Sequence, residues 1–199
     1  MTVQNPATGA RRSKFLGLAA VTIALLAWIV AQPQAHAAGN APTVAPANGA
    51  PSLPGGASSL NETHTDWNVN CVLRDNRKAC VFLQSQMNNS NQRVLLAELT
   101  ASAPDKVTGS LVLPFGLALN QGVTLLVGDT ALSAPLQFTT CLPAGCIVAV
   151  DFGAETVATL REGEGLNVKA AAAGGGEMAF KISLKGFSAA LDRTIALAN

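Results

Sequence analysis

Short segments in which apolar and polar residues alternate recur along this chain, and they constrain its fold more than any other feature. The segment Trp67-Asn68-Val69-Asn70-Cys71 alternates in this way, and so does the run from Met178 to Lys185. A period of two places successive side chains on opposite faces of a β-strand, whereas a helix repeats its apolar residues every three or four positions. The two segments therefore predict half-buried β-strands.

About nine such strands, each four to eight residues long, are expected along the chain, with polar or glycine-containing turns between them. Gly128 and Asp129 fit a tight hairpin between Val127 and Leu132. Because the strands are short and no long helical segments separate them, the pattern predicts an all-β fold, an antiparallel sandwich or barrel. The predicted strands span residues 67–71, 79–83, 94–99, 107–113, 123–127, 136–141, 147–152, 166–170 and 178–185.

Two segments carry helical signals. Residues 154–162 could form a brief helical turn that Gly163 closes. Near the end of the chain, apolar residues recur at helical spacing after Gly186, at Phe187, Ala190, Leu191 and Ile195. We interpret this second segment as a short C-terminal helix that caps one end of the sandwich, with a frayed tail as the alternative.

The first 37 residues have the layout of a secretory signal peptide. A basic stretch ends at Lys14, an uncharged run follows from Phe15 to Val30, and Ala35-His36-Ala37 fits an A-x-A cleavage site. The uncharged run is shorter than the ~20 residues of a membrane-spanning helix. We therefore expect cleavage after Ala37, export by the general or the twin-arginine route, and no permanent membrane span in the mature form.

The next segment, residues 38–60, is composed almost entirely of Ala, Pro, Gly, Asn and Ser. Its larger apolar side chains up to Ser59 are Val44 and Leu53, which follow no periodic order. Such a segment cannot bury enough surface to offset its chain entropy, so it predicts a flexible tether. The folded domain is then expected at residues 61–199, a length that suits one domain with one core.

The charge of the chain excludes some partners. After residue 37 the chain has 10 basic and 12 acidic residues, because Arg11, Arg12 and Lys14 all precede the cleavage point. A nearly neutral body gives no electrostatic reason to bind nucleic acid. We therefore expect no nucleic-acid partner.

The four cysteines are Cys71, Cys80, Cys141 and Cys146. An exported chain meets oxidising conditions, so two disulfides are the simplest interpretation. Four cysteines allow three pairings, and spacing favours the local one, in which Cys71 pairs with Cys80 and Cys141 with Cys146. A redox pair at Cys141 and Cys146 is the competing hypothesis, although four residues rather than two lie between them and no helix follows.

No catalytic, cofactor-binding or metal-binding residues are predicted. His64 and Asp66 are interpreted as a solvated loop at the start of the domain, and Gly174-Gly175-Gly176 as a mobile hairpin loop. The acidic residues Glu155, Glu162 and Glu164 lack the spacing of an EF-hand calcium site, so they predict a solvated face. Trp67 and the phenylalanines after the signal are expected to lie in the core.

The order of these landmarks resembles a known family over roughly Thr65 to Leu191. The matching landmarks are Asp66-Trp67 with Cys71 and Cys80, Leu113-Pro114-Phe115-Gly116-Leu117, Phe138-Thr139-Thr140-Cys141 with Gly145-Cys146, and Ser183-Leu184-Lys185-Gly186-Phe187. They are similar to those of the invasion-associated locus B family of bacterial envelope proteins. The resemblance implies an immunoglobulin-like β-sandwich, a periplasmic or outer-envelope location, paired cysteines and, in some members, a contribution to host-cell invasion.

These observations lead to one leading functional hypothesis and two alternatives. The leading hypothesis is a non-enzymatic binding or structural module that contacts an envelope protein or a host surface component. The first alternative is an envelope thiol oxidoreductase that uses Cys141 and Cys146. The second is a carrier that holds a small apolar ligand in a cavity between its two sheets.

Overall fold

The computed structural model describes residues 51–199, which form two antiparallel sheets and two helices. The predicted signal peptide at 1–37 and most of the predicted tether lie outside the described residues. The strands are β1 (Ser59–His64), β2 (Trp67–Arg74), β3 (Arg77–Met87), β4 (Arg93–Ala103), β5 (Lys106–Leu113), β6 (Val123–Val127), β7 (Thr130–Ala131), β8 (Phe138–Leu142), β9 (Gly145–Phe152), β10 (Gly165–Ala171) and β11 (Glu177–Ser183). The helices are α1 (Ala154–Glu162) and α2 (Phe187–Ala198), and two 3₁₀ turns are η1 (Pro54–Gly56) and η2 (Leu119–Gln121).

Seven strands form a large sheet and four form a small sheet. The large sheet has the order β1-β2-β3-β4-β5-β9-β8, and the small sheet has the order β11-β10-β6-β7. Short turns join β1 to β5 into a meander, and the β2–β3 turn shows a local cause. Asp75 and Asn76 both have positive φ, 49° and 56°, as a two-residue hairpin that follows the right-handed strand twist requires.

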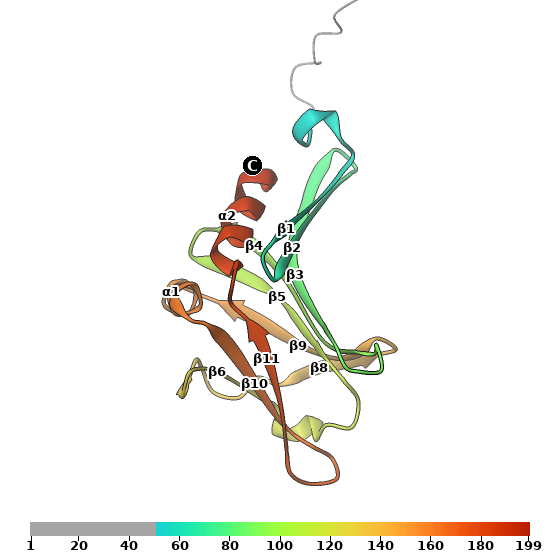
Figure 1. The fold of residues 1–199 in the computed structure, drawn as a ribbon, viewed down its shortest axis with the longest axis vertical. Helices are drawn as coiled ribbons and strands as arrows, with labels where there is room; N and C mark the ends of the chain where they lie inside the picture. The colour runs from blue at the N-terminus through green and yellow to red at the C-terminus, as the bar shows by residue number, and fades with distance from the viewer. Residues whose placement is uncertain (1–50) are drawn as a thin grey trace, which may run out of the picture. The chain divides into compact units, whose positions relative to one another are not determined.

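Both helices and the small sheet lie on the same side of the large sheet (Figure 1). Helix α2 packs on β2, β3 and β4 in the upper part of the view, and the small sheet covers the lower part. The residues of β2, β3, β4, β5 and β9 that point to this side are almost all buried and form the core. No other element of residues 51–199 packs on the opposite side, which we call the outer face of the large sheet.

An aromatic cluster joins α2 to the large sheet. Trp67 of β2, Phe82 of β3 and Phe187 of α2 are 0–1% exposed, and their ring centroids lie 5.3–5.6 Å apart. Edge-to-face and tilted aromatic contacts at this separation are favourable beyond the area they bury. The cluster therefore fixes the position of α2 on the sheet.

A buried glutamine links the two sheets. The side-chain amide of Gln84 on β3 donates to the carbonyl oxygen of Ser183 (2.9 Å) and accepts from the Ser183 backbone N–H (2.9 Å). The indole N–H of Trp67 donates to the same carbonyl oxygen (2.9 Å). Since Ser183 ends β11, an edge strand, these side chains satisfy backbone groups that would otherwise lack a partner in the interior.

The predicted all-β antiparallel fold with a short C-terminal helix is confirmed. Every predicted strand segment overlaps an observed strand, and α1 occupies the predicted residues 154–162. The predicted tight hairpin at Gly128 and Asp129 joins β6 to β7, with Val127 paired to Thr130. No helix of residues 51–199 has the length and apolar character that crossing a bilayer would require.

Ordered structure begins within the predicted tether, before residue 61, the predicted start of the domain. Leu53 is 1% exposed and belongs to the core, and β1 begins at Ser59. β1 has a weak strand signal because its inward positions are Leu60, Glu62 and His64, two of which are polar. Its backbone is nevertheless ordered by pairing with β2, from Ser59 opposite Val72 to His64 opposite Trp67.

Candidate binding surface

The middle of the chain is almost free of charge. Between Val107 and Val150 the single charged residue is Asp129. This stretch contains β5, β6, β7, β8 and most of β9, so it supplies one edge of the large sheet together with part of the small sheet. Surface strands and loops of an exported domain ordinarily carry charges, which makes the uncharged stretch a candidate for contact with another molecule.

The strand registers bring the exposed apolar side chains of this region to one end of the large sheet. Leu113 at the end of β5 lies opposite Cys146 on β9, and Leu142 at the end of β8 lies opposite Gly145. The β3–β4 and β8–β9 turns lie at this same end (Figure 1). Three of the most exposed large apolar side chains of residues 51–199 lie at or just beyond the strand ends there: Phe115 (60%), Met87 (57%) and Leu142 (51%). We call these three residues the apolar end. The fourth, Leu119 (42%), lies on η2, which contacts β10 of the small sheet.

The outer face of the large sheet continues the apolar end. Leu96, Val112 and Ile147 occupy one row across β4, β5 and β9, because each is directly opposite the next in the strand register. Directly opposed residues share a face, and all three are only half-buried. The ion pair between Lys106 and Asp151 lies at the other end of β5 and β9. Val112 and Ile147 are thus separated along β5 and β9 from the charged residues Lys106 and Asp151.

The prediction that all the phenylalanines lie in the core is wrong for Phe115. Phe115 follows β5 directly and projects from the connection to η2 with 60% of its surface exposed. In the sequence, the motif Leu113-Pro114-Phe115-Gly116 carries no information about which of its side chains face solvent. The scarcity of charge from Val107 to Val150 was the signal that could have identified this surface.

Both cysteine pairs lie at disulfide distance in the local arrangement that spacing favours. The Sγ atoms of Cys71 and Cys80 are 2.02 Å apart across β2 and β3, and those of Cys141 and Cys146 are 1.98 Å apart across β8 and β9. Helix α1 begins at the far end of β9, so no helix N-terminus lies next to Cys146. Without that feature, the fold offers no helix dipole to stabilise a thiolate at this pair.

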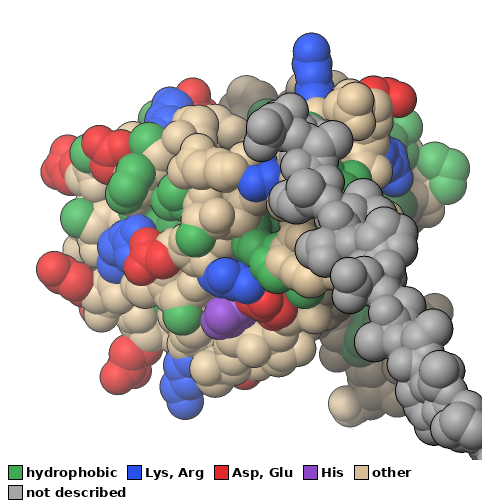
Figure 2. Space-filling view, turned by 90° about the horizontal axis from the view of Figure 1, so that it is seen from above, with side chains coloured by type: hydrophobic (Ala, Val, Ile, Leu, Met, Phe, Trp, Pro, Cys, Tyr) green, Lys and Arg blue, Asp and Glu red, His purple; other side chains and the backbone are tan. Residues whose placement is uncertain are grey.

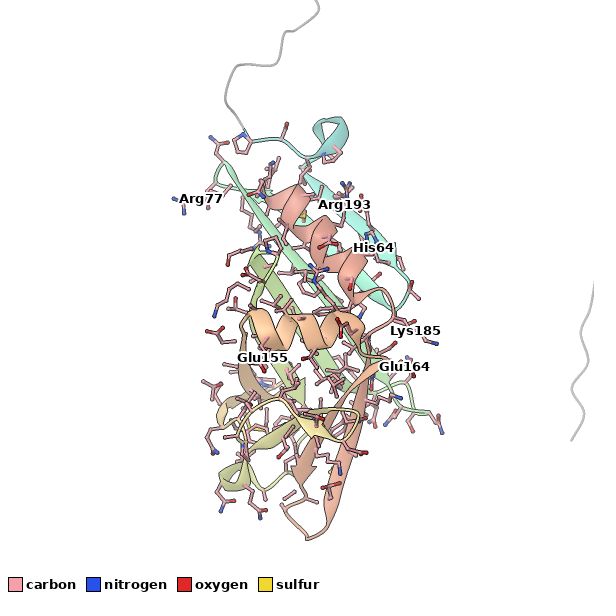
Figure 3. The ribbon with its side chains drawn as sticks, turned by 90° about the vertical axis from the view of Figure 1, so that its left-hand side faces the viewer. His64, Arg77, Glu155, Glu164, Lys185 and Arg193 are labelled. Atoms are coloured by element: carbon pink, nitrogen blue, oxygen red, sulfur yellow. A yellow bond between two sulfur atoms is a disulfide. The ribbon has the colours of Figure 1, made fainter. Side chains whose placement is uncertain are left out.

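The interpretation of His64 as part of a solvated loop is wrong. His64 ends β1 and faces α2, with its Nε2 atom buried and 3.4 Å from Oε2 of Glu62. Arg193 of α2 donates two hydrogen bonds to the Glu62 carboxylate, both 2.7 Å long. Figure 3 shows Arg193 on α2 and His64 on the neighbouring β1, and Figure 2 shows the histidine beside a basic and an acidic side chain. This cluster joins β1 to α2.

Pairing shifts the pKa values of Glu62 and Arg193. The hydrogen bonds from Arg193 lower the pKa of Glu62, with a further contribution from the Arg193 charge and from His64, although partial burial acts in the opposite direction. The hydrogen bonds to Glu62 raise the pKa of Arg193. The Glu62 carboxylate and the Arg193 guanidinium are thus paired between β1 and α2, whereas the buried Nε2 atom of His64 has no hydrogen-bond partner among residues 51–199. The paired charges favour a stabilising role over a catalytic one.

We expect Glu62→Gln to destabilise the protein at neutral pH and to lose this effect in acid. Because pairing lowers the pKa of Glu62 in the folded state, its contribution to stability is present above the unfolded-state pKa and is lost as the pH falls through the folded-state value. The difference in free energy of unfolding between wild type and Glu62→Gln should therefore shrink below about pH 4.3, the ordinary glutamate pKa. Urea unfolding from neutral to acid pH measures this difference.

The matched control for that experiment is Glu98→Gln. Glu98 is an exposed residue of β4 that takes part in no ion pair among residues 51–199. Its variant should differ little from wild type at every pH. A difference for Glu62→Gln that stays constant into acid would contradict the assigned role of the carboxylate.

The acidic residues Glu155, Glu162 and Glu164 do not converge. Glu155 lies at the start of α1 and Glu162 at its end, a separation of about 10 Å along the helix axis. Figure 3 shows Glu155 and Glu164 at opposite ends of α1. The glycines 174–176 lie in the loop between β10 and β11, as predicted from the sequence.

The space between the two sheets is filled by side chains. The enclosed cavity there, lined by residues that include Trp67, Leu111 and Phe152, has a volume of about 10 Å³. A volume of this size holds about one water molecule and no apolar ligand. This cavity is therefore too small for the apolar ligand that the carrier hypothesis places between the two sheets.

Comparison with known proteins adds a consistent set of relatives. The family model of the invasion associated locus B (IalB) protein matches residues 67–194. An invasion protein B homolog of Brucella abortus (strain 2308) is 51% identical over 150 residues, which cover 74% of this chain and 86% of that protein. Invasion protein B of Bartonella bacilliformis is 35% identical over 148 residues, which cover 73% of this chain and 80% of that protein.

A solved structure has the same fold. The crystal structure of invasion associated protein b from Bartonella henselae superimposes with a TM-score of 0.66 at 34% sequence identity. The superposition covers 70% of this chain and 97% of that chain. The sequence and structure comparisons therefore agree.

Proposed function

The chain belongs to the invasion associated locus B family, and on that premise we propose that it is a non-enzymatic binding module of the bacterial cell envelope. It is exported by its N-terminal segment and acts in the periplasm or at the outer envelope. Its partner is an envelope protein or a host surface component. The names of its relatives, which refer to invasion, support a role in contact with a host.

The apolar end carries this proposal. Phe115, Met87 and Leu142 are each more than half exposed, which is unusual for several large apolar side chains at one end of a small domain. Exposed apolar groups beside a charge-free strand are features of a protein-binding surface, because covering apolar groups releases water. The apolar end is thus the part of the surface that a partner would contact.

Export is supported by the N-terminal sequence and by the cysteine pairs. The basic stretch, the uncharged run and Ala35-His36-Ala37 have the layout of a signal peptide. The two disulfides join cysteines that are 9 and 5 positions apart in the sequence. Disulfides persist in an oxidising compartment. Fractionation of the source cells tests the location, and recovery in the cytoplasm with reduced cysteines would contradict it.

Crosslinking in intact cells tests the binding role. The wild-type protein should be recovered in a covalent adduct with an envelope protein, and the double variant Phe115→Ser/Leu142→Ser should give at least about tenfold less of that adduct. Ala189→Ser is the matched control, because it makes an exposed position of α2 polar and should leave the adduct unchanged. Equal yields from wild type and the double variant, or no adduct under any condition, would overturn the proposal.

A further inference from the structure

A polar hollow lies where the turn between β1 and β2 meets one end of the small sheet. Its lining comes from distant parts of the chain: Asp66 in the turn, Lys181 and Ser183 on β11, Lys185 just after β11, and Glu164 just before β10. The hollow has a volume of about 290 Å³, and Figure 3 shows Glu164 and Lys185 close together. Its lining residues contribute two carboxylates, two ammonium groups and one hydroxyl, and none of them is apolar.

Hydrogen bonds hold the side of the hollow that Asp66 and Ser183 form. The Ser183 hydroxyl donates to Oδ2 of Asp66 (2.5 Å), and the Asp66 backbone N–H donates to the carbonyl oxygen of Lys185 (3.4 Å). Ser183 is also held from the interior, because Gln84 bonds to both of its backbone groups. The Asp66 carboxylate is therefore positioned before any ligand arrives, which reduces the entropy that binding would cost.

A glycine makes room for the side chain of Lys181. A Cβ atom on Gly165 would overlap the Cε atom of Lys181, so the lysine side chain crosses β10 at a position that has no side chain of its own. Gly165 follows Glu164 directly and is paired with Ser183 across the two strands. The Lys181 side chain thus extends along the sheet toward Glu164 and Ser183.

The charges of the hollow are not paired with one another. The ion pairs of residues 51–199 include none of its four charged residues, Asp66, Glu164, Lys181 and Lys185. A simple anion or a simple cation in the hollow would be repelled by half of these groups. A ligand that carries both charges can instead contact groups of each sign. The lining therefore complements a zwitterion.

We propose that the hollow binds a small zwitterion with a primary ammonium group and a carboxylate, as a free amino acid or a dipeptide has. The ammonium group is bound by Asp66 and Glu164, and the carboxylate by Lys181 and Lys185. Hydrogen bonds between charged partners are stronger than neutral ones. The volume of about 290 Å³ lies at the lower end of the range for ligand pockets, which suits a small ligand.

An NMR titration of the purified, ¹⁵N-labelled exported protein with alanine and with the dipeptide Ala-Ala tests the hollow. Either ligand should give saturable shifts of the backbone amide signals of Asp66, Ser183 and Lys185. N-acetyl-alanine lacks the ammonium group and alanine amide lacks the carboxylate. Each should bind at least about tenfold more weakly than alanine, because two charged groups of the hollow then have no counter-charge. The tighter of alanine and Ala-Ala identifies the source of the two charges.

Substitutions at exposed positions locate the binding. Glu164→Gln and Lys181→Gln should each raise the dissociation constant for the tighter ligand at least about tenfold. Glu177→Gln and Lys169→Gln are the matched controls, because these two residues form an ion pair on the same side of the small sheet but outside the hollow. Both test residues are exposed, so the thermal midpoints of their variants should match that of wild type.

Three results would overturn the zwitterion site. They are the absence of saturable shifts up to about 10 mM of either ligand, equal binding of the derivatives that lack one charge, and equal affinities of the test and control variants. The hollow contains no residue of the apolar end, so the inference goes beyond the proposed function. Glu164→Gln should accordingly leave the crosslinked envelope adduct unchanged, and the failure of one proposal leaves the other intact.

Discussion

Replacing Gly186 with alanine is expected to lower the free energy of unfolding by about 2–5 kcal/mol. Gly186 precedes α2 with φ +86°, a left-handed conformation that costs an L-residue about 1–2 kcal/mol. A Cβ atom at this position would lie 2.0 Å from the carbonyl oxygen of His64 and 2.8 Å from its carbonyl carbon. Since these are backbone atoms of β1, relief requires α2 to move away from the strand, at a further cost of about 1–3 kcal/mol.

Gly174→Ala is the control for this effect. Gly174 lies in the β10–β11 loop, and a Cβ atom there would meet no heavy atom within 4 Å. Its variant should unfold within about 0.5 kcal/mol of wild type, as surface substitutions ordinarily do. Urea unfolding followed by far-UV circular dichroism measures both variants. A Gly186→Ala variant as stable as its control would show that β1 and α2 are not held at the distance seen here.

Replacing Trp67 with alanine is expected to cost about 3–5 kcal/mol, as truncation of a buried tryptophan does. Trp67 is 1% exposed and contacts both Phe82 and Phe187 in the aromatic cluster. Truncation would also remove the indole N–H that donates to the carbonyl oxygen of Ser183. Because domains are ordinarily stable by about 5–15 kcal/mol, the loss would be a large share of the free energy of unfolding.

The substitution Trp67→Phe separates packing from hydrogen bonding. It keeps an aromatic ring in the cluster but removes the indole donor, so a smaller loss of about 1–2 kcal/mol is expected. Gln84 would still donate to the Ser183 carbonyl in that variant. Far-UV circular dichroism is the appropriate probe, since the substitution removes the tryptophan itself. If Trp67→Ala costs no more than Trp67→Phe, the ring does not contribute through packing.

Local sequence patterns predicted most of the secondary structure. The alternation around Val69 and the helical spacing from Phe187 to Ile195 depend on side chains that face one common core, so the pattern and the structure agree. The pattern failed at β1. Its inward positions Glu62 and His64 are polar, and they are accommodated only because Arg193, distant in sequence, pairs with Glu62.

The candidate binding surface was much harder to predict. Phe115 and Phe82 look alike in the sequence, as aromatic residues in or beside apolar runs, yet Phe82 is fully buried and Phe115 is 60% exposed. The difference arises because Phe82 faces α2 and the small sheet, whereas Phe115 lies beyond the end of β5, where no layer covers it. Exposure of this kind depends on which elements come together in space.

By itself, the sequence determined most of the strand and helix segments, the hairpin at Gly128 and Asp129, and the scarcity of charge from Val107 to Val150. These properties depend on residues that are close together along the chain, so they can be predicted without knowledge of the tertiary contacts. Only the tertiary structure decided that β8 is an edge strand, that Gln84 bonds to the backbone of β11, and that His64 faces α2. Strand order and layer packing bring together segments more than 90 residues apart, such as Gln84 and Ser183, and no local pattern encodes that proximity.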